Sequence, residues 1–199
     1  YDSKVPANWA KVAYPSMRGL TTWLSDMLQR QRQLEAWTAD LALPKVTWIP
    51  GLFNPQAFLT AVMQVIARKN ELPLDRMTTV CDVTKKNSPD EVEAATRDGA
   101  YIHGFFLEGA RWDIATGMMD DSILKQLYCP MPVVLMKAAL LDKGAQRDIY
   151  ECPTYKTLTR NPVDGKPTGG FIFMAGLKTK QNVNKWVMAG VALIMDVES

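Results

Sequence analysis

The sequence holds a single histidine, His103, among 199 residues, and its three cysteines include no CxxC pair. A Ser-His-Asp or Cys-His catalytic device needs a histidine base beside a nucleophile, and no motif such as GxSxG accompanies this one. Structural zinc sites usually take their ligands in close pairs. Here the four possible ligands are each more than twenty residues apart: Cys81, His103, Cys129 and Cys152. A strand histidine and buried, apolar cysteines are therefore expected instead of a catalytic or zinc site.

An excess of charge of one sign and a long apolar run are also missing. Lys and Arg number 23 against 21 Asp and Glu, and the net charge is +2. This balance gives no electrostatic footprint for nucleic acid or an anionic membrane. No uninterrupted apolar run approaches the roughly 20 residues that span a bilayer. The odd number of cysteines favours reduced thiols, so we expect a soluble intracellular protein with neither nucleic acid nor membrane as a partner.

A phosphate-binding loop is absent too. The segment "NPVDGKPTGG" has glycines, a lysine and a threonine, but Pro167 separates Lys166 from Thr168 and a strand is expected to follow. A P-loop requires GxxxxGK followed at once by Ser or Thr and then by a helix. The acids of "SPDEVE" lie in a polar loop and are expected to be solvated. We therefore expect no nucleotide site in this chain.

The composition is that of an ordinary globular domain. Hydrophobic residues make up 47% of the chain and charged residues 22%, and 199 residues can bury a substantial core. The chain starts "YDSK", without Met or the apolar core of a signal peptide, and ends "VALIMDVES". These ends suggest a piece of a longer polypeptide, with the last domain as the expected location.

Two helices are expected in the first 75 residues. Over residues 16–40 the apolar side chains follow the i, i+3, i+4, i+7 pattern of an amphipathic helix, with Trp23 and Trp37 near one face. A second helix starts at Asn54, a good N-cap, with Pro55 at the first helical position, and stops near Asn70. These helices predict a helical subdomain over residues 1–75.

After Pro73 the pattern changes to short, β-rich runs between turn residues. Strands are expected over residues 77–83, 100–108, 111–113 continuing toward Gly117, 133–137, 150–158, 170–177 and 187–197. Few helical stretches separate them, which favours antiparallel neighbours. The fold class is therefore α+β, with an antiparallel β subdomain over residues 76–199.

The stretch "HGFFLEGARWD", from His103 to Asp113, gathers the lone histidine, two acids and an arginine. Gly109 interrupts it, and a glycine in a strand usually marks a bulge or tight bend. We expect a structural corner in which Glu108 and Arg111 pair with each other or with nearby backbone while Trp112 packs inward. The alternative is a paired-carboxylate hydrolase site using Glu108 and Asp113, which lacks other functional acids nearby in the sequence.

Longer motifs run through the whole sequence in a fixed order: "VPANWAKVAYPSMRGLTTWLSDML", "WIPGLFNPQAFLTAVMQVIARKN", "DGAYIHGFFLEGARWD", "MPVVLMKA", "YECPTYKTLTR" and "WVMAGVALIMD". In order and spacing they resemble the C-terminal domain of dynein heavy chains. The wording "FNPQAFLTA", "CDVTKK", "YECPTYKT" and "LKTK" is most similar to axonemal, outer-arm chains. One departure is the loop over residues 159–170, which is longer and richer in Gly and Pro than the family pattern suggests.

The resemblance implies a helical part followed by a small antiparallel β-barrel of about six strands. It also implies a non-catalytic regulatory module that packs against the AAA+ ring of its own heavy chain. No cofactor is expected in the domain, because ATP and Mg are bound by AAA+ modules elsewhere in the heavy chain. Microtubules would be reached only indirectly, other dynein subunits are further candidate partners, and the expected location is the cytoskeleton of a ciliary or flagellar axoneme.

Three tryptophans are the candidate ring-docking surface: Trp9, Trp23 and Trp37. Aromatic anchors commonly dominate interfaces, although the same side chains could instead fill the domain's own core. Two rival functions remain open. One is an independent β-barrel enzyme or small-ligand carrier that uses residues 103–113, and the other is a docking module for a separate axonemal protein.

Overall fold

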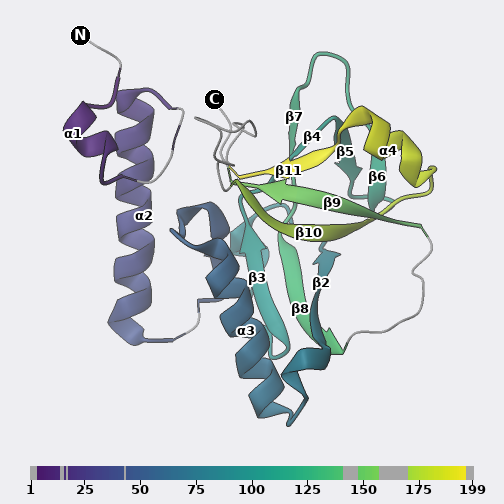
Figure 1. Ribbon diagram of the computed structural model, residues 1–199, viewed down its shortest axis with the longest axis horizontal. Helices are drawn as coiled ribbons and strands as arrows, with labels where there is room; N and C mark the ends of the chain where they lie inside the picture. The colour runs from purple at the N-terminus through teal and green to yellow at the C-terminus, as the bar shows by residue number, and fades with distance from the viewer. Residues whose placement is uncertain are drawn as a thin grey trace.

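The structure, a computed structural model, describes residues 4–13, 16, 18–42, 44–140, 148–156 and 170–195. It is an α+β arrangement in which the first helices precede most of the strands, as the sequence indicates (Figure 1). The described α-helices are α1 (Ala7–Ala10), α2 (Leu20–Asp40), α3 (Pro55–Lys69) and α4 (Val183–Ala189). Three short 3-10 helices are described as well: η1 (Ile49–Gly51), η2 (Leu74–Arg76) and η3 (Pro89–Glu91).

The helix starting after Asn54 is confirmed. The Asn54 side chain accepts a hydrogen bond from the Ala57 N–H at 3.0 Å, and Pro55 is the first residue of α3. This side chain satisfies one of the N–H groups that a helix start leaves unpaired, while the proline has none to lose. The first long helix begins at Leu20, a turn later than the apolar pattern suggests, because Gly19 is extended.

Four strands form the first sheet, in the order β1-β3-β8-β2. Their bounds are β1 (Val46–Trp48), β2 (Met77–Val83), β3 (Gly99–His103) and β8 (Val134–Leu140). β8 pairs antiparallel with both β2 and β3, whereas β1 pairs parallel with β3. The strand expected over residues 77–83 has the predicted bounds, and the sheet joins a strand from before residue 75 to strands from after it.

The second sheet has five strands in the order β10-β9-β11-β4-β7, and a two-stranded ribbon, β5-β6, adjoins it. The remaining bounds are β4 (Phe106–Glu108), β5 (Ala110–Asp113), β6 (Met118–Asp121), β7 (Tyr128–Pro130), β9 (Ile149–Tyr155), β10 (Phe171–Lys178) and β11 (Ala192–Ile194). The pairs are antiparallel except for β11 with β9, which is parallel.

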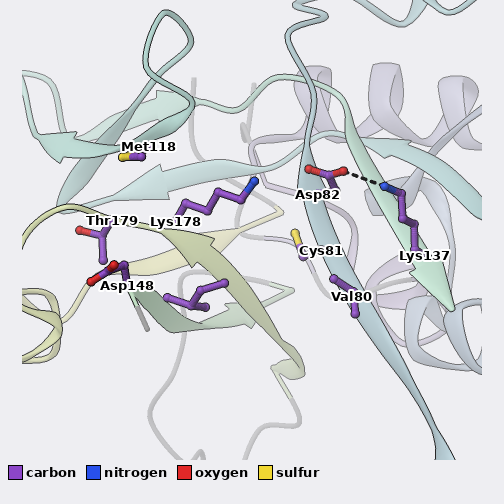
Figure 2. Close-up of a pocket in the computed structure, with 9 residues that line it drawn as sticks. Val80, Cys81, Asp82, Met118, Lys137, Asp148, Lys178 and Thr179 are labelled. Carbon is purple, nitrogen blue, oxygen red and sulfur yellow. Dashed lines mark hydrogen bonds and ion pairs between the residues drawn. The ribbon is translucent and has the colours of Figure 1, made fainter. Parts of the chain in front are cut away.

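The expected closed, antiparallel barrel is not confirmed, because the described strands form separate sheets with two parallel pairs. β2 and β10 are the terminal strands of the two larger sheets, and they contact each other without a ladder between them. The Lys178 side chain extends between these strands (Figure 2). Closure would require backbones about 4.8 Å apart along the seam, and a long charged side chain lying there opposes that approach.

Three of the expected strands are wrong in their extent. The strand expected to continue toward Gly117 ends at Asp113, where a turn over residues 114–117 begins. The strand over 100–108 is divided into β3 and β4 by Gly104, whose φ is 101° and where a Cβ would lie 2.7 Å from Pro50. The segment expected as a strand over 187–197 holds the end of α4 and then β11. Asn182 caps α4 and Gly190, at φ 65°, ends it, a start and stop typical of helices that the β-rich side chains obscured.

Three strands were not expected: β1, β6 and β7. β6 and β7 fall in the segments "ATGMMDD" and "CPMP", which look like turns by residue type. Each of these strands is only three or four residues long. Such short runs carry little periodicity, so their pairing depends on neighbours that are distant in the sequence.

The main core lies between α3 and the sheets. It includes Leu59 of α3, Ile102 of β3, Leu107 of β4, Leu193 of β11 and Trp186 of α4. Trp37 of α2 packs against this core from outside and is only partly buried, and no other described residue of α1 or α2 is grouped with it. Figure 1 accordingly shows α1 and α2 at one end of the molecule, beside α3.

Candidate functional site

The "HGFFLEGARWD" stretch forms a corner between three strands. β4 ends at Glu108, Gly109 turns the backbone with φ 76°, and β5 then carries Arg111 and Trp112 into the pairing with β6. Glu108 is partly buried and Trp112 is buried. A left-handed φ favours glycine because an L side chain would crowd the following carbonyl, so Gly109 has the bend role expected from the sequence.

Arg111 binds the neighbouring strand. Its guanidinium forms an ion pair with the Asp120 carboxylate on β6 and donates a hydrogen bond to the Asp121 backbone oxygen at 3.2 Å. Of the two expected arrangements, the contact with nearby backbone is present, and the ion pair is formed with Asp120 and not with Glu108. Arg111 therefore ties β5 to β6 at this corner.

Asp113 caps the turn that follows β5. Its carboxylate accepts hydrogen bonds from the Thr116 hydroxyl at 2.7 Å and from the Ala115 N–H at 3.1 Å. The Thr116 hydrogen bond is the largest of the effects that lower the pKa of Asp113. A carboxylate held in its charged form by turn groups suits a capping role and not that of a catalytic acid.

The possible zinc ligands lie on separate strands. Cys81 is on β2, His103 ends β3, Cys129 is on β7 and Cys152 is on β9; all three thiols are free. Within the described ranges no three His, Cys, Asp or Glu side chains come together as a metal site. Burial lowers the pKa of His103, which keeps its ring neutral at pH 7.

A cleft of about 470 Å³ separates the β2 edge of one sheet from the β10 edge of the other. Asp82 and Lys137 form an ion pair of 2.8 Å on one wall, and the Lys178 ammonium points toward them from the opposite strand (Figure 2). The Thr179 hydroxyl at the other end accepts a hydrogen bond from the Trp186 indole. Residues 103–113 do not line this cleft.

The thiol in this cleft is not an activated nucleophile. Burial raises the pKa of Cys81 to about 12, and the neighbouring Asp82 carboxylate adds to the effect. The thiolate is the reactive form of cysteine, and very little of it exists at neutral pH at that pKa. Among the described residues that line the cleft there is neither serine nor histidine, so these residues assemble no acyl-transfer arrangement.

We expect Cys81 to react with iodoacetamide at pH 8 on the order of 50-fold more slowly in the folded protein than in urea. The raised pKa removes most of the thiolate, while the greater nucleophilicity of a more basic thiol offsets part of that loss. Mass spectrometry of peptides sampled over time gives each rate. Cys129 lies on β7, outside this cleft, and serves as the internal comparison. Equal Cys81 rates in the folded and unfolded protein would contradict the raised pKa of this thiol.

The inner face of α2 carries buried polar side chains between Trp23 and Trp37. Asp26 and Arg30 are both buried and form an ion pair of 2.8 Å. The Arg30 guanidinium also donates to the Pro50 carbonyl oxygen of η1 and lies over the Trp48 ring, 5.5 Å from its centroid. The sequence carries a signal for the pair, since an acid four residues before a base is favourable on a helix, but its burial depends on β1 and η1.

Gln33 extends this polar contact by one turn. Its amide nitrogen donates to the Trp48 carbonyl oxygen at 3.0 Å, and its amide oxygen accepts from the Trp48 N–H at 3.0 Å. We name Arg30 and Gln33, with their backbone partners Trp48 and Pro50, the clasp. These residues were not among the candidates from the sequence.

The outer face of α2 exposes two leucines. Leu24 and Leu28 are each 44% exposed, one turn apart on the side away from the clasp. Val12, which follows α1, is also largely exposed. Buried charges beside Trp23 and Trp37 on the inner face, with two leucines on the outer one, depart from the usual pattern of a surface helix. Exposed apolar patches are typical of interaction surfaces.

The three candidate tryptophans occupy different environments. Trp9 is half-exposed and stacks on Trp23, with ring centroids 6.0 Å apart, so Trp23 is buried beneath it. Trp37 packs edge-on against Phe58 of α3 at 5.6 Å. Trp9 therefore lies at the surface beside α2, while Trp23 and Trp37 contact other residues of this domain. Their assignment to a docking surface stays a prediction.

The loop over residues 159–170, singled out for its glycines and prolines, lies outside the described residues except for Gly170. Among the described helices, none is long and apolar enough to cross a membrane.

The sequence is similar to several known proteins. The dynein beta chain, ciliary, of Tripneustes gratilla is 54% identical over 194 residues, which cover 98% of this sequence. The dynein beta chain, flagellar outer arm, of Chlamydomonas reinhardtii is 51% identical over 193 residues and 97% of this sequence. Dynein axonemal heavy chain 9 of Homo sapiens is 49% identical over 197 residues and 99% of this sequence.

The sequence spans only about 4% of the length of these relatives. The family model for the C-terminal domain of dynein heavy chains matches residues 1–195, nearly the whole sequence. The resemblance carried by the sequence motifs is thereby confirmed, and its similarity to axonemal, outer-arm chains as well. This protein belongs to the family formed by the C-terminal domains of dynein heavy chains.

Proposed function

We propose that this domain is a non-catalytic regulatory and structural module of an axonemal dynein heavy chain. It packs against the AAA+ ring of its own heavy chain and modulates microtubule-based motor output in ciliary or flagellar motility. It contacts microtubules only through the rest of the motor. ATP and Mg act in the AAA+ modules, and the domain itself needs no cofactor.

The observation that supports docking is a pair of leucines on the outer side of α2. Leu24 and Leu28 are partly exposed there, while Asp26 and Arg30 are buried within the domain. Covering the two leucines would remove apolar surface from water, worth about 25 cal/mol per Å². Trp9 of α1 and Val12, just after it, expose further apolar atoms. We name these four residues the docking face.

Docking of this kind can regulate a motor only through a difference in free energy. A contact that is equally strong in all ring conformations shifts nothing, whereas one that is stronger in one conformation raises its population. A domain that touches more than one ring module meets this condition, because the modules change their relative positions during the cycle. The names of the relatives, ciliary and flagellar outer-arm chains, support placing this activity in an axoneme.

Replacing Leu24 and Leu28 together by Asp should detach the domain from the ring without unfolding it. Each interface leucine is expected to contribute roughly tenfold to the docking equilibrium, and both side chains are already substantially exposed in the domain. The measurements are crosslinks between this domain and the AAA+ modules in the intact heavy chain, and the microtubule gliding velocity of the same preparation.

Leu124→Asp is the matched control, since Leu124 is 88% exposed in the β6–β7 loop at a distance from α2. It should leave both measurements unchanged. If the double variant keeps wild-type crosslinks and velocity, ring docking through α2 is wrong. Crosslinks to a separate axonemal protein, with none to the AAA+ modules, would favour the docking-module alternative.

A further inference from the structure

Helices α1 and α2, here named the strap, contribute little to the interior of the domain. All described buried residues of the main core lie at Ile49 or later in the sequence. We name the chain from β1 onward the body. Trp37 of the strap packs on the core of the body from outside. A groove of about 350 Å³ remains between α2 and the body, lined on opposite sides by Leu34 and Phe53. The strap therefore lies on a body whose core is complete without it.

The described contacts that hold the strap on the body are mainly polar. Gln33 and Arg30 bind backbone oxygens of Trp48 and Pro50, and Gln33 also accepts the Trp48 N–H. The apolar contribution is the edge-on packing of Trp37 on Phe58. Hydrogen bonds are exchanged for bonds to water when two surfaces separate, so a polar contact costs less to open than an apolar one of equal area.

The strap also has an internal structure that can survive opening. Asp26 and Arg30 are an i, i+4 pair on one helix, so they stay together when α2 moves. Trp9 and Trp23 stack between the two helices of the strap. α2 ends at Asp40, its C-cap Leu41 has a left-handed φ of 50°, and Pro44 lies shortly before β1. Leu41 and Pro44, which belong to neither helix nor strand, are natural pivot residues.

We infer that the strap detaches from the body as one unit, with the clasp as its latch. In the closed state Arg30 and Gln33 hold η1 and the end of β1. In the open state the clasp groups are hydrated while the body keeps its sheets and core. Local opening of an element with few buried apolar contacts occurs below the free energy of global unfolding. If the proposed function holds, a strap bound to the AAA+ ring can move relative to the body while the body stays in place. This consequence rests on the proposed function.

Hydrogen–deuterium exchange on the 199-residue protein tests the latch directly. Gln33→Ala removes both bonds to Trp48. It should speed exchange of the α2 amides roughly tenfold, because a helix that has left the body is only marginally stable and frays, with β3 and β8 amides unchanged. Gln31→Ala is the matched control, because Gln31 lies on the same helix and bonds only to the exposed Glu35 in the described contacts. It should leave exchange in α2 near the wild-type rate.

Each other outcome overturns the inference. Unchanged α2 exchange in Gln33→Ala would show that the clasp is not a latch. Faster exchange in α2 and in the body strands together would show that strap and body open as one cooperative unit. The experiment contains no ring, so its result does not depend on docking. Faster α2 exchange here, together with an absence of crosslinks to the AAA+ modules in the wild-type heavy chain, would support the latch and reject the proposed function.

Discussion

Gly99→Ala is expected to destabilise the domain by about 3 kcal/mol or more. Gly99 begins β3 and lies opposite Lys137 of β8. A Cβ at this position would lie 1.9 Å from the Met136 carbonyl oxygen and 2.8 Å from its carbon. Both atoms belong to the backbone of the paired strand, so no side-chain rotation can relieve the overlap. The strands must separate, which weakens the ladder at the centre of the four-stranded sheet.

Urea denaturation of the purified domain measures this loss as a lower midpoint at constant slope. Gly117→Ala is the control: Gly117 has a φ of 67° and open space around its Cβ, so only the backbone cost of about 1 kcal/mol applies. A Gly99→Ala variant that is no less stable than Gly117→Ala would show that β3 and β8 are not paired as described.

Trp186→Ala is expected to cost about 3–5 kcal/mol, the range for deleting a large buried aromatic side chain. Trp186 is 1% exposed, and its indole N–H donates to the Thr179 hydroxyl at 2.8 Å. The substitution leaves a cavity between α4 and the five-stranded sheet, and it removes one of the two donors to the buried Thr179 hydroxyl, the other being the Gln181 N–H. Since stabilities of natural domains are about 5–15 kcal/mol, much of the native state could be lost at 37 °C.

Two further variants separate these causes. Trp186→Phe keeps most of the volume and removes the hydrogen bond, so it should lie between wild type and Trp186→Ala. Val187→Ala changes the adjacent residue, which is exposed on the same helix, and should shift stability by less than about 0.5 kcal/mol. Large losses from both Trp186→Ala and Val187→Ala would indicate that α4 is not oriented as described. Differential scanning calorimetry of the three variants provides the comparison.

A docking test needs substitutions that leave the domain folded. Substitution of a core residue such as Trp186 would abolish ring contacts by unfolding the domain and would say nothing about the interface. Leu24 and Leu28 reduce this ambiguity because neither belongs to the core and both are partly exposed in the folded domain. Trp23 does not, since it is buried beneath Trp9.

Much of the helical part and of the corner could be predicted from the sequence. Asn54 and Pro55 start α3 through contacts within one turn, and Gly109 makes its bend through its own φ. Strand β2 has the expected bounds because its β-rich run is bounded by turn residues on both sides. The motifs also identified the family. In each case the signal lies within a few residues of the feature that it predicts.

Other features depended on partners that are distant along the sequence. β1 is three residues long and becomes a strand by pairing with β3, more than fifty residues later. Gly104 divides a β-rich run because Pro50 packs against it. The unclosed seam between β2 and β10, with the charged cleft along it, is found in place of the barrel that the family resemblance implied.

The candidate site likewise combines features set by local sequence with features set by distant partners. The sequence alone determined the family, the α+β class and the residues of the corner, because these follow from local preference and from motif order. Only the tertiary structure decided that α2 turns Arg30 and Gln33 inward and Leu24 and Leu28 outward. The physical reason is that a helix is oriented by what it packs against: the free backbone groups of Trp48 and Pro50 select polar partners, and no periodicity within α2 reveals that they are there.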